Sequence, residues 1–361
     1  MITIALAATA ATAAAISAAP AGLLGHRQLR RRSNAKALRI DTPNGISEAG
    51  FVRIGGIDQW IEIRGEDLAN PVLLDLHGGP GATNIYFANR TREWERHFTI
   101  VRWDQRGTGK TFGRGDQGEM SFQQLCTDAL EVTRYVQRRL RTGKVVLLGN
   151  SFGSVLGLRL ARNHPELYSA YVGTDQNILG GERDDSVFYA TVQRLRDNGK
   201  RSDAAKLEQI GPDETKWSAA DWGLHAKLKT SSDPFLVEML KKLILPSMWF
   251  SPQHGLRDLK DGASGMKFSE QLGVESVHFD SWRDGTRFEL PFFIFQGEHD
   301  TLMPADRARR YFDDVQAPHK EFALITDATH FASCWQPAQF LELLLTRVRP
   351  VVTGDQTRLP A

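Results

Sequence analysis

The chain has 361 residues, of which 41% are hydrophobic and 24% charged, and its formal net charge is +2. This composition is ordinary for a globular protein with a sizeable core, and the length fits one large domain or one domain with an insertion. So small a net charge gives no reason to expect a nucleic acid as partner. The two cysteines, Cys126 and Cys334, show no metal-ligand spacing, and a disulfide between them cannot be deduced from the sequence.

The N-terminal segment is unusual. Residues 2–25 contain no charged side chain and are rich in alanine, and a basic cluster, His26 to Arg32, follows directly. About 20 apolar residues can span a bilayer, and basic residues beside a span favour the cytoplasmic side. We therefore expect residues 1–25 to be a membrane anchor with the remaining chain in the cytoplasm. Two alternatives are an export signal cleaved near Ala18-Ala19-Pro20 and an Ala/Thr-rich flexible tail on a soluble cytoplasmic protein.

Residues 26–48 are basic and then polar, which predicts a linker. Two runs, residues 51–54 and 59–63, alternate apolar and polar side chains around Gly55-Gly56, as the strands of a hairpin do. Further strand-like apolar runs are residues 71–76, 98–103, 144–148, 168–174, 291–295 and 320–325. Helical patterns are residues 121–141, 154–162, 305–315 and 337–348, and a tail is expected over 350–361. Strands alternating with helices predict an α/β fold with a mostly parallel central sheet and helices on both faces.

The character of the chain changes between residues 176 and 285. Apolar strand runs disappear there, and charged, helix-forming stretches such as 187–198 and 234–245 take their place. We interpret this segment as a helical cap inserted into the core and lying over the carboxyl edge of the sheet. The core itself is then expected over residues 49–175 and 286–349.

The most informative stretch is Gly149-Asn150-Ser151-Phe152-Gly153, which lies between an apolar strand run and a helical run. Strand, Gly-x-Ser-x-Gly and helix are the context of a nucleophile elbow, in which a sharp turn exposes the serine. The outer glycines are needed because the strand and helix backbones nearly touch. Ser151 is the candidate nucleophile, and the N–H of Phe152 at the helix start is a candidate oxyanion donor.

A glycine-rich loop, His77-Gly78-Gly79-Pro80-Gly81, ends an earlier strand. An elbow serine needs a second oxyanion donor from such a loop, and we assign it to Gly79. We interpret His77 as a side chain that holds the loop by a hydrogen bond rather than as the catalytic base.

Two more strand ends carry candidates, Asp300 and His330. The order Ser151, Asp300, His330 is that of an α/β-hydrolase triad. His330 would take the serine proton as a base, and Asp300 would fix the imidazole and stabilise its charged form. The neighbouring Glu298 and His299 are rival candidates for the acid and the base.

The chain from about residue 50 to 349 resembles the α/β-hydrolase superfamily, and within it the proline iminopeptidase-like serine peptidases. The motif at 77–81, the Asp104-Gln105-Arg106-Gly107-Thr108-Gly109 turn and the elbow carry this resemblance. It implies an aminopeptidase that releases N-terminal residues, often proline, from small peptides. It also implies a helical cap and no metal or organic cofactor.

Some positions depart from that family. Phe152 stands where an aromatic such as Trp is usual, and Ala328-Thr329 precede His330 where Gly-Gly is usual. The family binds the substrate's amino group through cap carboxylates, and here the candidates, chosen by location only, are Glu182, Asp184, Asp185 and Glu238. The alternatives are therefore a carboxylesterase, lactonase or amidase acting on small acyl substrates, and a non-catalytic binding protein on the same fold.

Overall fold

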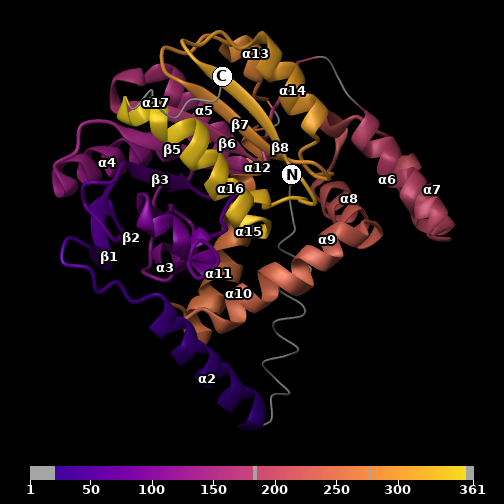
Figure 1. Cartoon of the computed structure of the whole chain (residues 1–361). Coiled ribbons are helices and arrows are strands. Elements are labelled where there is room, and N and C mark those ends of the chain that lie inside the picture. The colour runs from indigo at the N-terminus through magenta and orange to yellow at the C-terminus, as the bar shows by residue number, and fades with distance from the viewer. Residues whose placement is uncertain (1–20, 182–184, 277, 355–361) are drawn as a thin grey trace.

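The structure is a computed structural model that describes residues 21–181, 185–276 and 278–354 (Figure 1). Within these residues the strands form an eight-stranded sheet with the order β1-β2-β4-β3-β5-β6-β7-β8. The strands are β1 (Ile46–Ile54), β2 (Ile57–Gly65), β3 (Val72–Leu76), β4 (Thr99–Asp104), β5 (Val145–Asn150), β6 (Tyr168–Thr174), β7 (Phe292–Gly297) and β8 (Lys320–Ile325). The β1–β2 and β2–β4 pairs are antiparallel, and all other neighbouring pairs are parallel. This confirms the predicted α/β fold.

Turn and helix-capping residues end these elements at positions that the sequence predicts. Gly55 and Gly56 join β1 to β2 with φ of 53° and 79°, and positive φ at both central residues is the geometry that a two-residue hairpin turn prefers. The Ser121 hydroxyl accepts a hydrogen bond from the N–H of Gln124 (3.1 Å) and caps the start of α4 (Phe122–Leu140).

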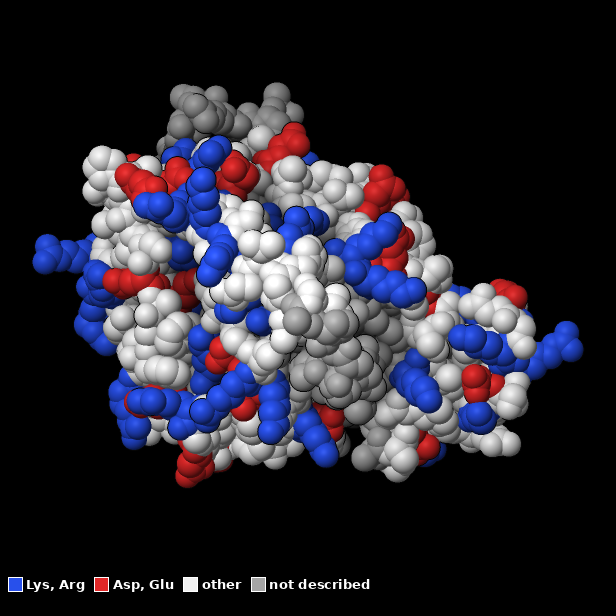
Figure 2. All heavy atoms as spheres, turned by 90° about the horizontal axis from the view of Figure 1, so that it is seen from below, with Lys and Arg blue, Asp and Glu red and all other residues white. Residues whose placement is uncertain are grey.

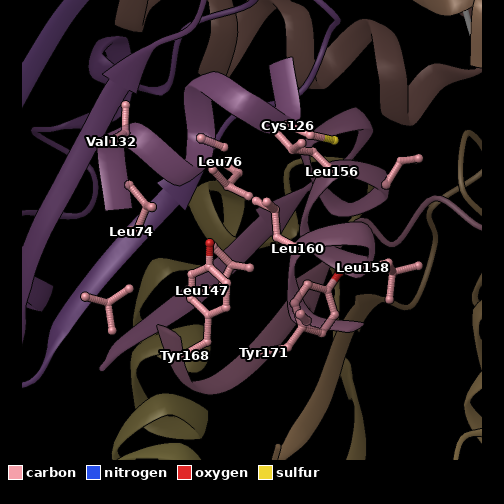
Figure 3. Close-up of a cluster of buried hydrophobic side chains, with 14 of the residues drawn as sticks. Leu74, Leu76, Cys126, Val132, Leu147, Leu156, Leu158, Leu160, Tyr168 and Tyr171 are labelled. Atoms are coloured by element: carbon pink, nitrogen blue, oxygen red, sulfur yellow. The ribbon is translucent and has the colours of Figure 1, made fainter. Parts of the chain in front are cut away.

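Helices cover both faces of the sheet because its side chains alternate between two buried clusters. The helices on one face are α4, α5 (Phe152–Asn163) and α14 (Ala305–Asp314), and those on the other are α16 (Pro337–Leu343) and its continuation η6 (Leu344–Val348). Leu74 and Leu147 lie in the first cluster with Leu156 of α5, as Figure 3 shows. Leu73 and Val146, one position earlier, lie in the second cluster. Burying such a side chain contributes about 1.5–3 kcal/mol, so this two-sided core is a main source of stability.

The segment between β6 and β7 is helical, as predicted, and no strand occurs in its described part. Its helices are α6 (Ser186–Asp197), α7 (Arg201–Ile210), η4 (Glu214–Lys216), α8 (Ala219–Ser232), α9 (Pro234–Met239), η5 (Leu240–Ile244), α10 (Leu245–Phe250), α11 (Leu256–Phe268), α12 (Glu270–Ser276) and α13 (Ser281–Asp284). Ser269 donates a hydrogen bond to the carbonyl of Gly107 (3.1 Å) after β4, and Thr301 after β7 donates to Asp233. The cap therefore lies against the carboxyl ends of the strands.

The two predicted ends of the core need correction. Residues 26–48, predicted to be a linker, instead contain most of helix α2 (Ala21–Ala37) and the first residues of β1. Residues 350–361, predicted to be a tail, begin in helix α17 (Arg349–Thr353), in which Pro350 is buried.

Helix α2 is clamped to the cap. Arg27 is buried and donates hydrogen bonds to the carbonyls of Trp249 (2.9 Å) and His254 (3.2 Å), and its guanidinium lies over the Trp249 ring. Arg31 donates to the carbonyls of Ser251 and Pro252 (2.9 and 3.0 Å). The last carbonyls of a helix lack partners within it and carry partial negative charge. The two arginines therefore satisfy the end of α10 and the turn that follows it.

The membrane anchor predicted for residues 1–25 falls almost wholly outside the described residues. Among the residues that the structure describes, no helix has both the length and the apolar character needed to cross a bilayer. Helix α2 contains no Asp or Glu, whereas basic and acidic side chains are interspersed over the face that Figure 2 shows. The anchor and the cytoplasmic placement of the domain stay predictions.

We expect the substitution Arg27→Ala to lower the free energy of unfolding by about 2 kcal/mol, because charged hydrogen bonds to buried carbonyls contribute about 1.5–3 kcal/mol. Urea denaturation followed by circular dichroism measures it. Arg32→Ala, at an exposed position of the same helix, should change the free energy little. Equal losses in both variants would contradict the clamp.

Candidate active site

Ser151 lies at the tip of a sharp turn between β5 and α5. Its backbone angles, φ 54° and ψ −121°, lie outside the regions that L-residues favour. The turn is crowded on both sides: a Cβ on Gly153 would come within 2.0 Å of the Leu76 carbonyl oxygen, and one on Gly149 within 2.7 Å of the Ser154 Cα. Only glycine fits at either position, so the structure has the sharp strand-turn-helix geometry that the sequence predicts around Ser151.

The three predicted triad residues meet in one hydrogen-bonded chain. His330 Nε2 lies 3.1 Å from Ser151 Oγ, and His330 Nδ1 lies 2.9 Å from Asp300 Oδ2. All three residues are buried. Because an ionised carboxylate only accepts hydrogen bonds, Nδ1 carries the proton and Nε2 can accept from the serine hydroxyl.

The Asp300 carboxylate is held from several sides. Its Oδ1 accepts hydrogen bonds from the main-chain N–H groups of Leu302 and Met303 (2.9 Å each). The Gln296 side-chain amide donates to Oδ2 (3.3 Å). These donors stabilise the charged carboxylate and direct Oδ2 toward the imidazole.

Opposing effects act on the pKa of His330. Burial lowers it, but the negative charge of Asp300, the hydrogen bond to Asp300 and the nearby Asp175 together raise it above the ordinary value. Lys229 of the cap helix α8 is close enough to lower it again in part. The net direction is upward, so the surroundings of His330 favour its protonated form.

The loop at 77–81 packs directly against the serine. A Cβ on Gly78 would lie 2.7 Å from the Ser151 Cβ and 3.3 Å from the Phe152 nitrogen. Gly79 has φ of 118°, which favours glycine. The N–H of Phe152 is one of the first in α5 and so has no acceptor within its helix. The assignment of the Gly79 and Phe152 N–H groups as oxyanion donors stays a prediction.

His77 holds this loop, as predicted. Its Nε2 accepts from the N–H of Gln105 (3.1 Å), so its Nδ1–H donates to the Gly78 carbonyl (3.0 Å). Burial lowers the pKa of His77 to about 4, which keeps the ring neutral. His77 is therefore occupied in holding the loop, and His330 is the histidine within hydrogen-bond distance of Ser151.

The turn at 104–109 fixes the loop from the other side. The Arg106 guanidinium pairs with both oxygens of Asp128 (2.9 and 3.1 Å) and donates to the carbonyl of Gly55 (2.7 Å). Gln105 also donates from its side chain to the His77 carbonyl (3.2 Å). The two family motifs therefore support each other and, through the loop, the position of Ser151.

The rival candidates lie away from this chain. The side chains of Glu298 and His299 are 41% and 40% exposed, and His299 stacks on Phe235. Of the cap carboxylates, Glu238 is partly exposed and pairs with Lys242 on the same helix. Asp185 stands at the N-cap position of α6, and Glu182 and Asp184 lie outside the described residues.

Sequence reasoning missed one residue, Asp175. It directly follows β6, is fully buried, and offers an oxygen within 4.8 Å of ligand atoms of Asp300 and His330. Burial and the charge of Asp300 raise the pKa of Asp175, His330 and nearby main-chain N–H groups lower it, and the net result is a pKa of about 7. The three side chains have the donor types of a metal site. Asp300 and His330 are hydrogen-bonded to each other, so the arrangement is better explained as part of the triad.

Comparisons with known proteins identify the fold. The family model of the alpha/beta hydrolase fold matches residues 71–337. The probable aminopeptidase YbaC of Bacillus subtilis is 27% identical over 301 residues, covering 82% of this chain and 94% of its own. A proline iminopeptidase of Lactobacillus delbrueckii is 24% identical (81% and 95% covered), and a putative carbamate hydrolase RutD of Agrobacterium fabrum is 29% identical (82% and 99% covered). The crystal structure of a proline iminopeptidase-related protein from Thermus thermophilus superposes with a TM-score of 0.56 at 19% identity, covering 85% of this chain and 99% of that one.

The chain therefore belongs to the α/β-hydrolase family. The relatives that it resembles at 24–29% identity include proteins named as an aminopeptidase, as proline iminopeptidases and as a carbamate hydrolase.

We expect Gly153→Ala to destabilise the protein by about 3 kcal/mol or more, at or above the usual cost of overpacking, because the added methyl meets a fixed backbone oxygen. The free energy of unfolding in urea measures the effect. Gly143→Ala is the matched control, since nothing lies within 4 Å of its Cβ position. Similar stability of the two variants would show that the elbow is less crowded than described.

The raised pKa of His330 gives a second expectation. Only the neutral imidazole can accept the Ser151 proton, so labelling of Ser151 by a fluorophosphonate should be slow at acidic pH. The rate should rise as pH increases through a midpoint above 6.5, the ordinary pKa of histidine. Labelling rates across a pH series, corrected for spontaneous hydrolysis of the probe, measure the midpoint. A midpoint below 6.5 would contradict the expectation.

Proposed function

We propose that the protein is a serine hydrolase that releases N-terminal residues from small peptides, an aminopeptidase of the proline iminopeptidase type. The observation that carries the chemistry is the buried chain from Ser151 Oγ through His330 to Asp300. The substrate class rests on the two family motifs and on the aminopeptidase names of the relatives.

In this proposal Ser151 Oγ attacks the carbonyl carbon of the scissile amide, and its proton passes to His330 Nε2. The negative charge that develops on the carbonyl oxygen is stabilised by the N–H groups of Phe152 and Gly79. One such donor is worth about 2.7–4 kcal/mol in other enzymes. Asp300 stabilises the imidazolium, which then protonates the leaving amine. A water molecule, deprotonated by His330, hydrolyses the acyl-enzyme and restores Ser151.

A second candidate is a carboxylesterase, lactonase or amidase acting on small acyl substrates. The positive charge of Lys229, which the cap places near the triad, favours this second candidate. Lys229 is 9% exposed, and burial lowers its pKa to about 8, so it is mostly charged at neutral pH. Its charge acts on Asp300 and His330. A cation there would repel a substrate's ammonium group and would accept a neutral or anionic acyl group.

A parallel rate assay on purified protein distinguishes the two candidates. The substrates are prolyl- or alanyl-naphthylamide and a short-chain nitrophenyl ester, each also measured with Ser151→Ala. We expect amide cleavage that depends on Ser151 and disappears when the substrate's amine is acetylated, because an aminopeptidase must bind the free amine.

Ester turnover that depends on Ser151, with the aminoacyl amides inert, would overturn the aminopeptidase and support the second candidate. Full activity of Ser151→Ala toward both substrates would overturn the serine mechanism itself. The substitution Ser151→Ala removes only the hydroxyl, and its thermal unfolding shows whether the fold is kept.

A further inference from the structure

The four neighbouring strands β5, β6, β7 and β8 each present one polar residue beyond their carboxyl end. Ser151 follows β5, Asp175 follows β6, Asp300 lies beyond β7 and His330 lies beyond β8. Since parallel strands end at the same edge, these side chains converge, and the triad accounts for three of them. The fourth, Asp175, has no role in the mechanism described above.

Asp175 is held in a position that it would not adopt without support. Its exposure is 0% and its φ is 48°, in the left-handed region. One carboxyl oxygen, Oδ1, accepts from the N–H of Ala332 (3.0 Å), two residues beyond His330. The other, Oδ2, has no hydrogen-bond partner in the part of the chain that the structure describes. A buried acceptor without a partner costs about 1–3 kcal/mol of stability. An aspartate with a purely structural role at this position would therefore destabilise the fold.

The surroundings of Asp175 show what the carboxyl can act on. An oxygen of Asp175, an oxygen of Asp300 and a ring nitrogen of His330 all lie within 4.8 Å of one another. One imidazole is therefore flanked by two carboxyl groups. The other titratable groups that face them are Lys229, from the cap, and the buried thiol of Cys334. Of these neighbours, only His330 changes its charge during the proposed reaction.

We propose that Asp175 is a second acid of the triad, a positioning residue that stabilises protonated His330 together with Asp300 and can replace Asp300 as its partner. This inference rests on the serine mechanism proposed above. Each time Ser151 gives its proton to His330, a positive charge forms between the two carboxyls. The attraction of a second carboxylate lowers the free energy of that imidazolium. If Asp300 loses its charge, Asp175 is the remaining carboxyl group beside His330, with an oxygen within 4.8 Å of a ring nitrogen.

The substitution Asp→Asn separates this role from a structural one. An asparagine at position 175 has the same shape, and its side-chain oxygen can still accept from Ala332, but it carries no charge. The variants to compare are Asp300→Asn, Asp175→Asn and the double variant. Asp327→Asn is the matched control, because Asp327 also has a positive φ (52°) after a strand but is exposed.

The measurement is the rate of Ser151 labelling by a fluorophosphonate as a function of pH, which requires no knowledge of the substrate. Loss of the triad aspartate in another serine hydrolase costs about 10⁴-fold. We expect Asp300→Asn to lose only about 10–100-fold, a loss of the size seen when a group that orients a metal-bound histidine is removed, and the double variant to fall by about 10⁴-fold. Asp175→Asn alone should move the pH midpoint of labelling to lower pH, since His330 loses a stabilising charge. Asp327→Asn should match the wild type in rate and midpoint.

Equal rates for Asp300→Asn and the double variant would overturn the inference, as would an unchanged midpoint in Asp175→Asn. The pH midpoint of Asp175→Asn tests the inference even if Asp300→Asn fails to fold. These outcomes differ from a failure of the proposed function. That failure would appear as full substrate turnover by Ser151→Ala, whatever residue stands at 175.

Discussion

The structure of the active site depends on one crowded contact, where the turn after β5 meets the end of β3. Gly153 lies so near the Leu76 carbonyl that any side chain would collide with it. This closeness forces Ser151 into backbone angles that cost about 1–3 kcal/mol for a residue with a side chain. The strain is sustained because β3, β5 and α5 are fixed by the two-sided core. Its result is a serine hydroxyl at the start of a helix, 3.1 Å from the imidazole of His330, which lies 179 residues away in the chain.

The parallel sheet brings Ser151 and His330, which are far apart in the sequence, close together in space. Parallel strands all end at the same edge of the sheet, so the residues that follow them are brought to that edge. The loops there are free to differ while the strands hold their relative positions. The same edge also receives the motifs at 77–81 and 104–109, which brace each other through His77 and Gln105. Catalytic geometry in this chain is therefore a property of the sheet edge, and no single motif carries it.

Much of this could be read from the sequence, and the reasons are local. Ser151, Asp300 and His330 each follow an apolar run, and glycine spacing reports the elbow because no other residue fits there. Asp175 also follows such a run, but no motif surrounds it, and its meaning depends on how β6 lies beside β7. Helix α2 could not be predicted from the sequence for a similar reason. Its arginines have the composition of a basic linker, and the carbonyls they bind lie 220 or more residues away. Every residue has a main-chain carbonyl, so the sequence does not show which carbonyls an arginine will bind.

The cap also affects the electrostatics of the candidate active site. Asp300 and Asp175 place two carboxyl groups beside one imidazole, and the cap adds Lys229 near them. With burial keeping water away, each of these charges affects the others more strongly than it would at the surface. If Asp175 is ionised, the two carboxylates outnumber the lysine, and the net negative charge favours an ammonium group near the serine. If Asp175 is protonated, Asp300 and Lys229 balance each other, and no net negative charge attracts an ammonium group. The protonation state of Asp175 would thus affect both the basicity of His330 and the charge of the substrate that the cap accepts, so the two proposals made above are physically linked through one carboxyl group.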